Sequence, residues 1–266
     1  MISNLSLELS ALYLACLLYA AFSLIALSQR LGSRYRLLAL TLATFGLISH
    51  SISIGARWIR VDHGPFINLY EILSSNLWSN MLGLTLFFLL LPAAGIVLRL
   101  ALPVVLLLMA WLLVTPGPDG HLPPTYNTPW LYFHVFSGKI FFTLLLLASG
   151  SALHALLLGR TPGDPDAPAF SELAHRLLAF AFVAESLMLF FGAIWAQDAW
   201  GRYWSWDPLE TWAFATWLVV IFTLHSQVDS RKGRLFLVLI PICLTLAFLT
   251  FFGVPFISTS AHQGAI

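Results

Sequence analysis

Residues 235–257 read LFLVLIPICLTLAFLTFFGVPFI, a long run without one charged side chain. A transmembrane helix needs about 20 apolar residues to cross the hydrocarbon core of a bilayer. Seven more long apolar stretches precede this one, so the sequence predicts an all-α, polytopic transmembrane bundle of about eight helices. The predicted helices cover residues 7–29, 37–56, 72–93, 97–115, 131–158, 177–197, 213–229 and 235–257.

The composition of the whole chain agrees with this fold class. Of its 266 residues, 59% are hydrophobic and 9% are charged, whereas soluble domains carry about 25% charged residues. No soluble domain and no internal repeat are evident, so we expect residues 1–266 to form a single integral membrane domain. The net charge of +1 indicates no nucleic-acid partner. Cys16 and Cys243 both fall in apolar stretches and no C-x-x-C is present, which argues against thiol–disulfide exchange by this chain.

Basic residues predict the orientation in the membrane. Nine of the thirteen Lys and Arg residues lie in the loops after the first, third, fifth and seventh predicted helices. Loops rich in Lys and Arg stay on the cytoplasmic side. Both termini are therefore predicted on the outer side, which is the periplasm in a bacterium, and the loops on that side carry most of the chemically distinctive residues.

The most distinctive of these segments is rich in tryptophan. Residues 195–217 read WAQDAWGRYWSWDPLETWAFATW and hold six of the ten tryptophans. An interfacial aromatic belt explains one or two Trp at a helix end, but not a run interleaved with Gly201, Asp207 and Glu210. We expect an outer Trp-rich loop at about residues 195–212 whose flat, apolar surface binds a planar macrocycle with two carboxylates, such as heme. Indole N–H groups and the forked guanidinium of Arg202 suit those carboxylates.

Imidazole is the usual protein ligand of heme iron, and the predicted topology sorts the histidines. His134 lies at the outer start of the fifth helix, and His262 lies just beyond the eighth. Both are at the level of the Trp-rich loop on different elements, so they are predicted to bind opposite faces of one iron. A capping role would suffice for His134 taken alone. His63 and His121, in outer loops, are weaker alternative ligands.

Three further residues lie within predicted helices. His225 is twelve residues beyond the predicted start of the seventh helix, about 18 Å along its axis at 1.5 Å per residue. Ionisable groups at such depth are candidates for function. His225 is expected either to bind a second heme with a ligand from another subunit or to form a structural hydrogen bond. Lys139 and Glu185 are expected to form a buried ion pair between neighbouring helices.

Several segments resemble one family. WGRYWSWDPLETWAF at residues 200–214 resembles the WWD signature of heme-handling cytochrome c assembly proteins, and its continuation at 207–212 is similar to the CcsA (ResC) branch. ARWIRVDHGPFINLYEIL at 56–73 and WLYFHV at 130–135 agree with the same branch. The resemblance covers roughly residue 45 to the end. Leu209 departs from it, since a lysine is common there.

This resemblance implies a detailed function. It implies heme transport and covalent attachment of heme b to a CXXCH-containing apocytochrome c, in the bacterial cytoplasmic membrane with a periplasmic active face. The chain would be the membrane subunit of a cytochrome c synthase (heme lyase), acting with a CcsB (ResB) subunit and thiol-reducing assembly proteins. A HemX-like heme-handling or regulatory protein without synthase activity is the alternative. The intact Trp-rich loop together with both outer histidines argues against it.

The resemblance also assigns residues by position. His134 and His262 match two outer axial histidines of the heme iron. His225 matches a membrane-embedded heme ligand whose partner comes from CcsB. The matches to the heme-binding loop and its continuation are Trp200, Trp204, Trp206, Asp207 and Trp212.

Overall fold

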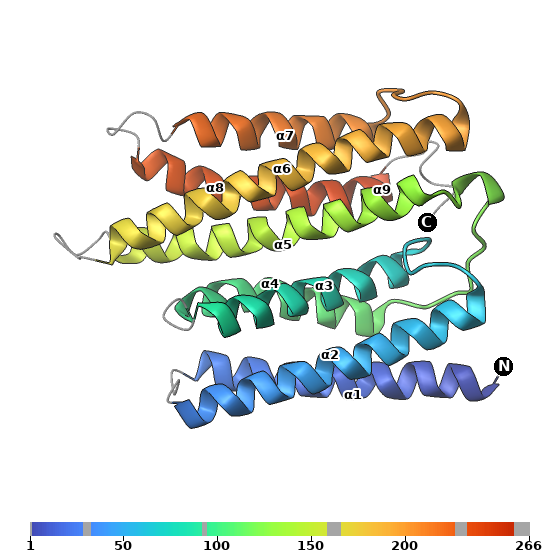
Figure 1. Cartoon of the computed structure of the whole chain (residues 1–266), viewed down its shortest axis with the longest axis horizontal. Helices are drawn as coiled ribbons and strands as arrows, with labels where there is room; N and C mark the ends of the chain where they lie inside the picture. The colour runs from blue at the N-terminus through green and yellow to red at the C-terminus, as the bar shows by residue number, and fades with distance from the viewer. Residues whose placement is uncertain (1, 29–32, 92–94, 159–165, 227–232, 258–266) are drawn as a thin grey trace. The chain divides into compact units, whose positions relative to one another are not determined.

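The computed structural model describes residues 2–28, 33–91, 95–158, 166–226 and 233–257 (Figure 1). The long helices are α1 (Ile2–Leu27), α2 (Ser33–Val61), α3 (Leu69–Leu90), α4 (Ile96–Val114), α5 (Pro129–Leu158), α6 (Ala167–Trp200), α7 (Pro208–Ser226) and α8 (Gly233–Phe248). A π-helical turn (Leu249–Gly253) and the short helix α9 (Val254–Ile257) continue α8, and a 3-10 turn (Pro124–Tyr126) precedes α5.

Eight helices in the described part of the chain are long and apolar enough to span a membrane. The predicted all-α, eight-helix membrane fold is therefore confirmed. The helices are longer than their apolar stretches where their ends are polar or aromatic. In particular, α6 continues to Trp200 and α7 begins at Pro208, so the non-helical part of the Trp-rich segment is only residues 201–207.

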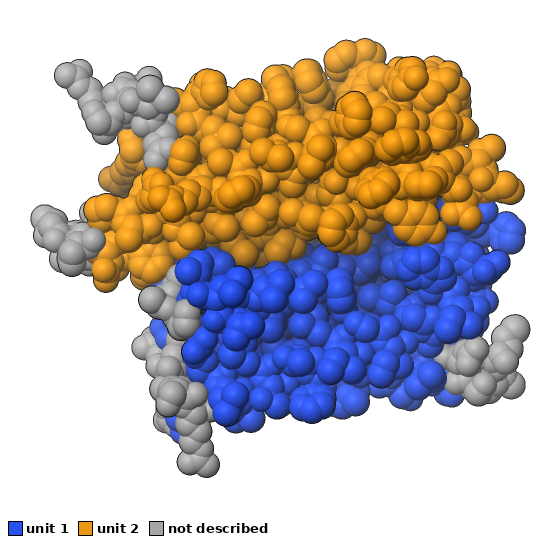
Figure 2. Space-filling view, viewed as in Figure 1, with its two compact units in different colours: residues 1–122 blue, residues 123–266 orange. Residues whose placement is uncertain are grey.

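The chain forms two compact units, residues 1–122 and residues 123–266 (Figure 2). In the first unit α1 packs on α2, α2 on α3, α3 on α4, and α4 on α1. In the second unit α5 packs on α6, α6 on α7, α7 on α8, and α8 on α5. Each unit has its own apolar core, with Phe22, Met81 and Phe88 fully buried in the first, and Phe142 and Phe236 in the second.

Buried ion pairs tie together one end of the first unit. Arg57 of α2 contacts Glu8 of α1 at 3.1 Å and Glu71 of α3 at 2.8 Å. Arg60 contacts the second Glu8 oxygen at 2.8 Å and also binds Asp119 in the segment after α4. The hydrogen bond from Arg60 lowers the pKa of the exposed Asp119 carboxyl below its usual value. These contacts join all the elements that meet at this end.

Candidate functional site

A seven-residue loop joins α6 to α7 in the second unit. The helix α6 ends at Trp200, and Gly201 caps it with a φ of 78° in the left-handed region and an N–H that binds the Gln197 carbonyl. Glycine is the residue that takes this conformation without a steric cost. Only residues 201–207 of the segment expected at 195–212 lie outside helices. The loop is short, so its tryptophans are held close to the ends of both helices.

Two carboxylates anchor this loop to the start of α7. Asp207 Oδ1 accepts a hydrogen bond from the Glu210 N–H at 2.9 Å. Glu210 Oε2 accepts bonds from the Ser205 N–H at 2.7 Å and from the Ser205 hydroxyl at 3.2 Å. This reciprocal pattern resembles a capping box, except that the glutamate binds the N–H two residues before the cap. The loop that it holds includes Trp206 at a φ of 57°, which is unfavourable for a large side chain. The Asp207 side chain therefore has a structural task.

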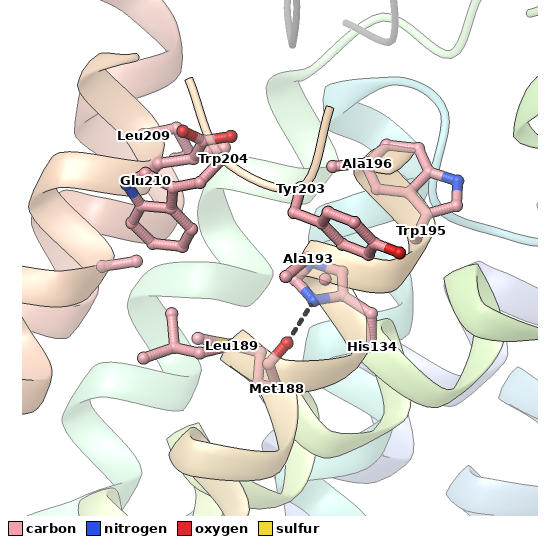
Figure 3. Close-up of a pocket in the computed structure, with 12 residues that line it drawn as sticks. His134, Met188, Leu189, Ala193, Trp195, Ala196, Tyr203, Trp204, Leu209 and Glu210 are labelled. Atoms are coloured by element: carbon pink, nitrogen blue, oxygen red, sulfur yellow. Dashed lines mark hydrogen bonds between the residues drawn. The ribbon is translucent and has the colours of Figure 1, made fainter. Parts of the chain in front are cut away.

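His134 lines a pocket beneath this loop (Figure 3). The walls come from α6, from the loop and from the first turns of α7. They include Tyr203, Trp204, Leu209 and Glu210. The pocket encloses about 60 Å³, whereas sites for drug-sized ligands enclose about 300–1,000 Å³. The pocket is therefore smaller than such sites.

The imidazole of His134 is held in one tautomer. Its Nδ1 lies 2.8 Å from the main-chain oxygen of Met188 (Figure 3). A carbonyl oxygen only accepts hydrogen bonds, so Nδ1 carries the proton and Nε2 carries the lone pair that a metal binds. Gly192 makes this approach possible, since a Cβ there would lie 2.7 Å from Nδ1. The ring also stacks on Trp195, with centroids 6.2 Å apart and planes inclined by 13°.

The structure brings Trp204 and Trp206 to one groove, but not the other tryptophans that were predicted to act with them. Trp204 lines the His134 pocket and also an apolar groove of about 440 Å³, whose walls include Trp206 and Phe214. Trp206 lines only the groove. Trp200 packs edge-on against Trp195, and Trp212 lines neither cavity. Arg202 is exposed and also lines neither of them.

Most of the residues that line the pocket were not identified from sequence. Tyr203, Glu210 and Leu209 line it from the loop and α7, and Gly192 lines it from α6. The spacing Asp-x-x-Glu at 207–210 is a recognisable capping signal that could have assigned Glu210 to the loop. Nothing in the sequence singles out Gly192 from the other glycines.

The remaining histidines divide clearly. His225 is exposed in the last turn of α7. The predicted distance of about 18 Å from the start of this helix is wrong, because α7 begins at Pro208, and seventeen residues span about 26 Å. His63 is buried, and its two ring nitrogens face the Gly64 and Gly120 carbonyls at 2.9 and 3.2 Å, so it is unsuited to bind iron. His121 is exposed, and His262 lies outside the described residues.

The expected ion pair between Lys139 and Glu185 is wrong. Glu185 is fully buried, but both its carboxyl oxygens lack a hydrogen-bond partner within the described parts of the chain. The sequence predicts that both residues lie within transmembrane helices, but it does not predict the direction in which each side chain points.

Fold and site together define a multi-span membrane protein with a pocket, lined by an imidazole and tryptophans, at the loop between α6 and α7. The family model described as "Cytochrome C assembly protein" matches residues 5–262. The chain belongs to the cytochrome c assembly protein family, as its motifs predicted.

Several relatives carry the description "Cytochrome c biogenesis protein CcsA". The protein from Prochlorococcus marinus subsp. pastoris is 28% identical, over 91% of this chain and 86% of the relative. The protein from Gloeobacter violaceus is 26% identical, over 96% of this chain and 93% of the relative. A solved structure, "Cytochrome c Heme Lyase CcmF", matches with a TM-score of 0.69 and 18% identity, over 98% of this chain and 48% of that chain. At this identity the structural match shows a shared fold.

Proposed function

We propose that this chain binds heme b beside His134 and presents it for covalent attachment to an apocytochrome c. It would act as the membrane subunit of a cytochrome c synthase, together with a CcsB-like subunit. The observation that carries this proposal is the His134 geometry. A main-chain carbonyl fixes Nδ1 as the donor, so Nε2 carries the lone pair with which an imidazole binds a metal. Tryptophans line the same pocket.

The residues present fit a heme. The His134 imidazole would supply a ligand to the heme iron. The indole N–H of Trp204 is buried without a hydrogen-bond partner in the described structure. Because an unsatisfied buried donor is costly, a propionate oxygen that accepted this hydrogen bond would stabilise the loaded state. Arg202 is exposed on the same loop, where its guanidinium suits the second propionate.

When bound, heme supplies the two vinyl groups to which the cysteine thiols of a CXXCH segment add to form thioethers. The residues of this chain position that chemistry. His134 would bind the heme iron, and we propose His262 as a second ligand. Trp204 and Trp206 present flat apolar surface to the macrocycle. Asp207 and Glu210 hold the loop that carries both tryptophans.

We also propose that His225 binds heme at an earlier stage of transport. Its side chain is exposed at the end of α7 opposite the Trp-rich loop. An exposed imidazole on an apolar helix is available to a cofactor shared with a second subunit. A CcsB-like partner would then supply the opposite ligand.

The orientation can be tested with introduced cysteines. Thr125 and Asp166 are exposed and lie at the two ends of α5 and α6, while the native Cys16 and Cys243 are buried. Thr125→Cys in intact cells should react with a membrane-impermeant thiol reagent, because the basic loops predict that this side faces out. Asp166→Cys should react only after the cells are permeabilised. Labelling of residue 166 in intact cells would reverse the orientation.

The proposed function is tested by the heme content of tryptophan variants. Trp204→Ala should lower the heme bound per purified protein several-fold, because Trp204 lines both cavities. Stacking of a flat nucleobase on an aromatic side chain contributes about 1–3 kcal/mol, and we expect a similar contribution for the flat face of a macrocycle. Trp206→Ala should have a smaller effect. Trp212→Ala is the matched control, since this residue lines neither cavity. Pyridine hemochrome assays and spectra of the reduced protein provide the measurement. Equal heme in the Trp204 and Trp212 variants would contradict the proposed site.

A further inference from the structure

The loop between the second and third helices has the same backbone pattern in both units. In the first unit, α2 is followed by Asp62, which has a φ of 60°, and residues 62–68 lead to α3. In the second unit, α6 is followed by Gly201, which has a φ of 78°, and residues 201–207 lead to α7. Both loops thus have the same length and begin with a residue in the left-handed region.

The two loops are also anchored in the same way. Asn68 Oδ1 accepts a hydrogen bond from the Glu71 N–H at 3.0 Å, and Glu71 Oε2 accepts one from the Ile67 N–H at 2.9 Å. Asp207 caps the Glu210 N–H in the same way, but Glu210 holds the N–H of Ser205, which lies one position earlier in the loop than the counterpart of Ile67. In each unit an Asn or Asp caps the third helix, and a glutamate three residues later holds the loop.

A third match lies further along the same helices. Trp78 donates its indole N–H to the Ser51 hydroxyl on the preceding helix at 2.9 Å. Trp217 donates its indole N–H to the Ser186 hydroxyl on the preceding helix, also at 2.9 Å. The same difference in residue number, 217 − 78 = 139, therefore relates the left-handed residues, the capping residues, the glutamates and the tryptophans of the two units. The matched positions are 62 and 201, 68 and 207, 71 and 210, and 78 and 217.

The helices around these loops correspond too. In each unit the third helix packs on the second, α3 on α2 and α7 on α6. The fourth helix of each unit contains an internal proline, Pro103 in α4 and Pro241 in α8. The same cycle of neighbours holds in both units. A neighbour cycle alone is common in four-helix bundles. Simple packing does not require loops of equal length, caps at matched positions and matched tryptophans that each bind a serine of the preceding helix, although the two serines differ by one helical turn in position.

Two lining positions of a pocket in each unit also correspond. A pocket of about 210 Å³ in the first unit is lined by Glu8, Arg57 and Tyr70. The same offset in residue number that relates the loops takes Arg57 to Ala196 and Tyr70 to Leu209. Both Ala196 and Leu209 line the His134 pocket.

Glu8 occupies the place of His134 on the first helix of its unit. The Glu8 carbonyl accepts a hydrogen bond from the Ser53 hydroxyl at 2.8 Å. Ser53 corresponds to Gly192 by the same offset, and a side chain at Gly192 would touch the His134 ring. Glu8 and His134 therefore face equivalent positions of the second helix in their units.

We infer that the chain consists of two tandem copies of one four-helix module, and that the Glu8 pocket is the non-ligating counterpart of the His134 pocket. In the first copy a carboxylate paired with Arg57 and Arg60 stands where the second copy has an imidazole. The ion pairs stabilise the first copy, whereas in the proposed function the second copy presents its imidazole to a cofactor. Asn68 and Asp207 are equivalent positioning residues, each of which holds the loop of its own copy.

Matched cap variants of the full-length chain test this inference. Asn68→Ala and Asp207→Ala should lower the thermal midpoint of heme-free protein by similar amounts, about 2–4 °C. Asn68→Asp and Asp207→Asn should restore it, since both residues cap helices well. Destabilisation by only one alanine variant would show that the two positions are not equivalent and would overturn the inference.

A second readout rests on the proposed function. In heme-loaded protein, Asp207→Ala should reduce heme per folded protein and broaden the reduced spectrum, whereas Asn68→Ala should leave both unchanged. Loss of heme in Asn68→Ala equal to that in Asp207→Ala would show that the first copy shares the cofactor site, and would overturn its non-ligating assignment. If the wild-type protein binds no heme, the proposed function fails, but the thermal comparison still decides the equivalence of the two copies.

Discussion

Arg57→Leu should destabilise the protein more than any other single change in the first unit. The side chains of Arg57, Glu8 and Glu71 are 5%, 2% and 0% exposed. Removing the guanidinium leaves the buried Glu71 carboxylate without its cation and leaves Glu8 with Arg60 alone. Breaking a buried ion pair in this way costs about 3–5 kcal/mol. We expect a large loss of folded protein in the membrane and a thermal midpoint lowered by several degrees, measured by fluorescence-detected size exclusion after heating.

A surface pair provides the matched control for this variant. Arg176 and Glu172 form a salt bridge at 2.7 Å, with side chains 70% and 52% exposed. Such exposed pairs contribute about 0–1 kcal/mol, so Arg176→Leu should leave the thermal midpoint nearly unchanged. If Arg57→Leu were as mild as Arg176→Leu, the buried network would not be what holds the first unit together.

The membrane helices could be predicted because apolar length is a strong and local signal. Helix ends were harder to place, since the last turns of α6 and the first turns of α7 are aromatic and polar. The segment 195–212 therefore read as a loop, although most of it is helical. The same error shortened the predicted distance of His225 from the start of α7.

The pocket was predictable in part. His134 and Trp204 were identified from their residue types, and the structure brings them to one pocket. The partner of His134 is a main-chain oxygen, which no sequence pattern encodes. The Lys139–Glu185 pair failed for a related reason, because a pair of charges inside helices does not reveal their rotation about the helix axes.

The repeated module escaped detection because the two copies share geometry rather than residue types. When residues 62–78 are aligned with residues 201–217, only the glutamate and the tryptophan are identical. Asn68 and Asp207 are different residue types, but both side chains cap a helix in the same way. Asp62 and Gly201 share a backbone conformation that the sequence alone does not display.

His134→Gly should abolish cytochrome c maturation and remove the low-spin heme spectrum. Two neutral imidazoles on opposite faces give six-coordinate iron with narrow absorption bands in the reduced state. Without His134 one axial position is open, so the bands should broaden and shift. Absorption spectra of the reduced, purified protein measure the coordination, and heme staining of the c-type cytochromes measures maturation.

Two companion experiments separate ligand loss from misfolding. Free imidazole should partly restore the spectrum of His134→Gly, because a small ligand can enter the vacated position. Gly192→Ala keeps the imidazole but places a Cβ 2.7 Å from its Nδ1, so the ring must leave the Met188 carbonyl that orients it. This variant should therefore perturb the spectrum while its heme content falls less than in Trp204→Ala. An unaltered low-spin spectrum and normal maturation in His134→Gly would contradict the ligand assignment, and because both His63 nitrogens face backbone carbonyls, the exposed His121 would be the next residue to test.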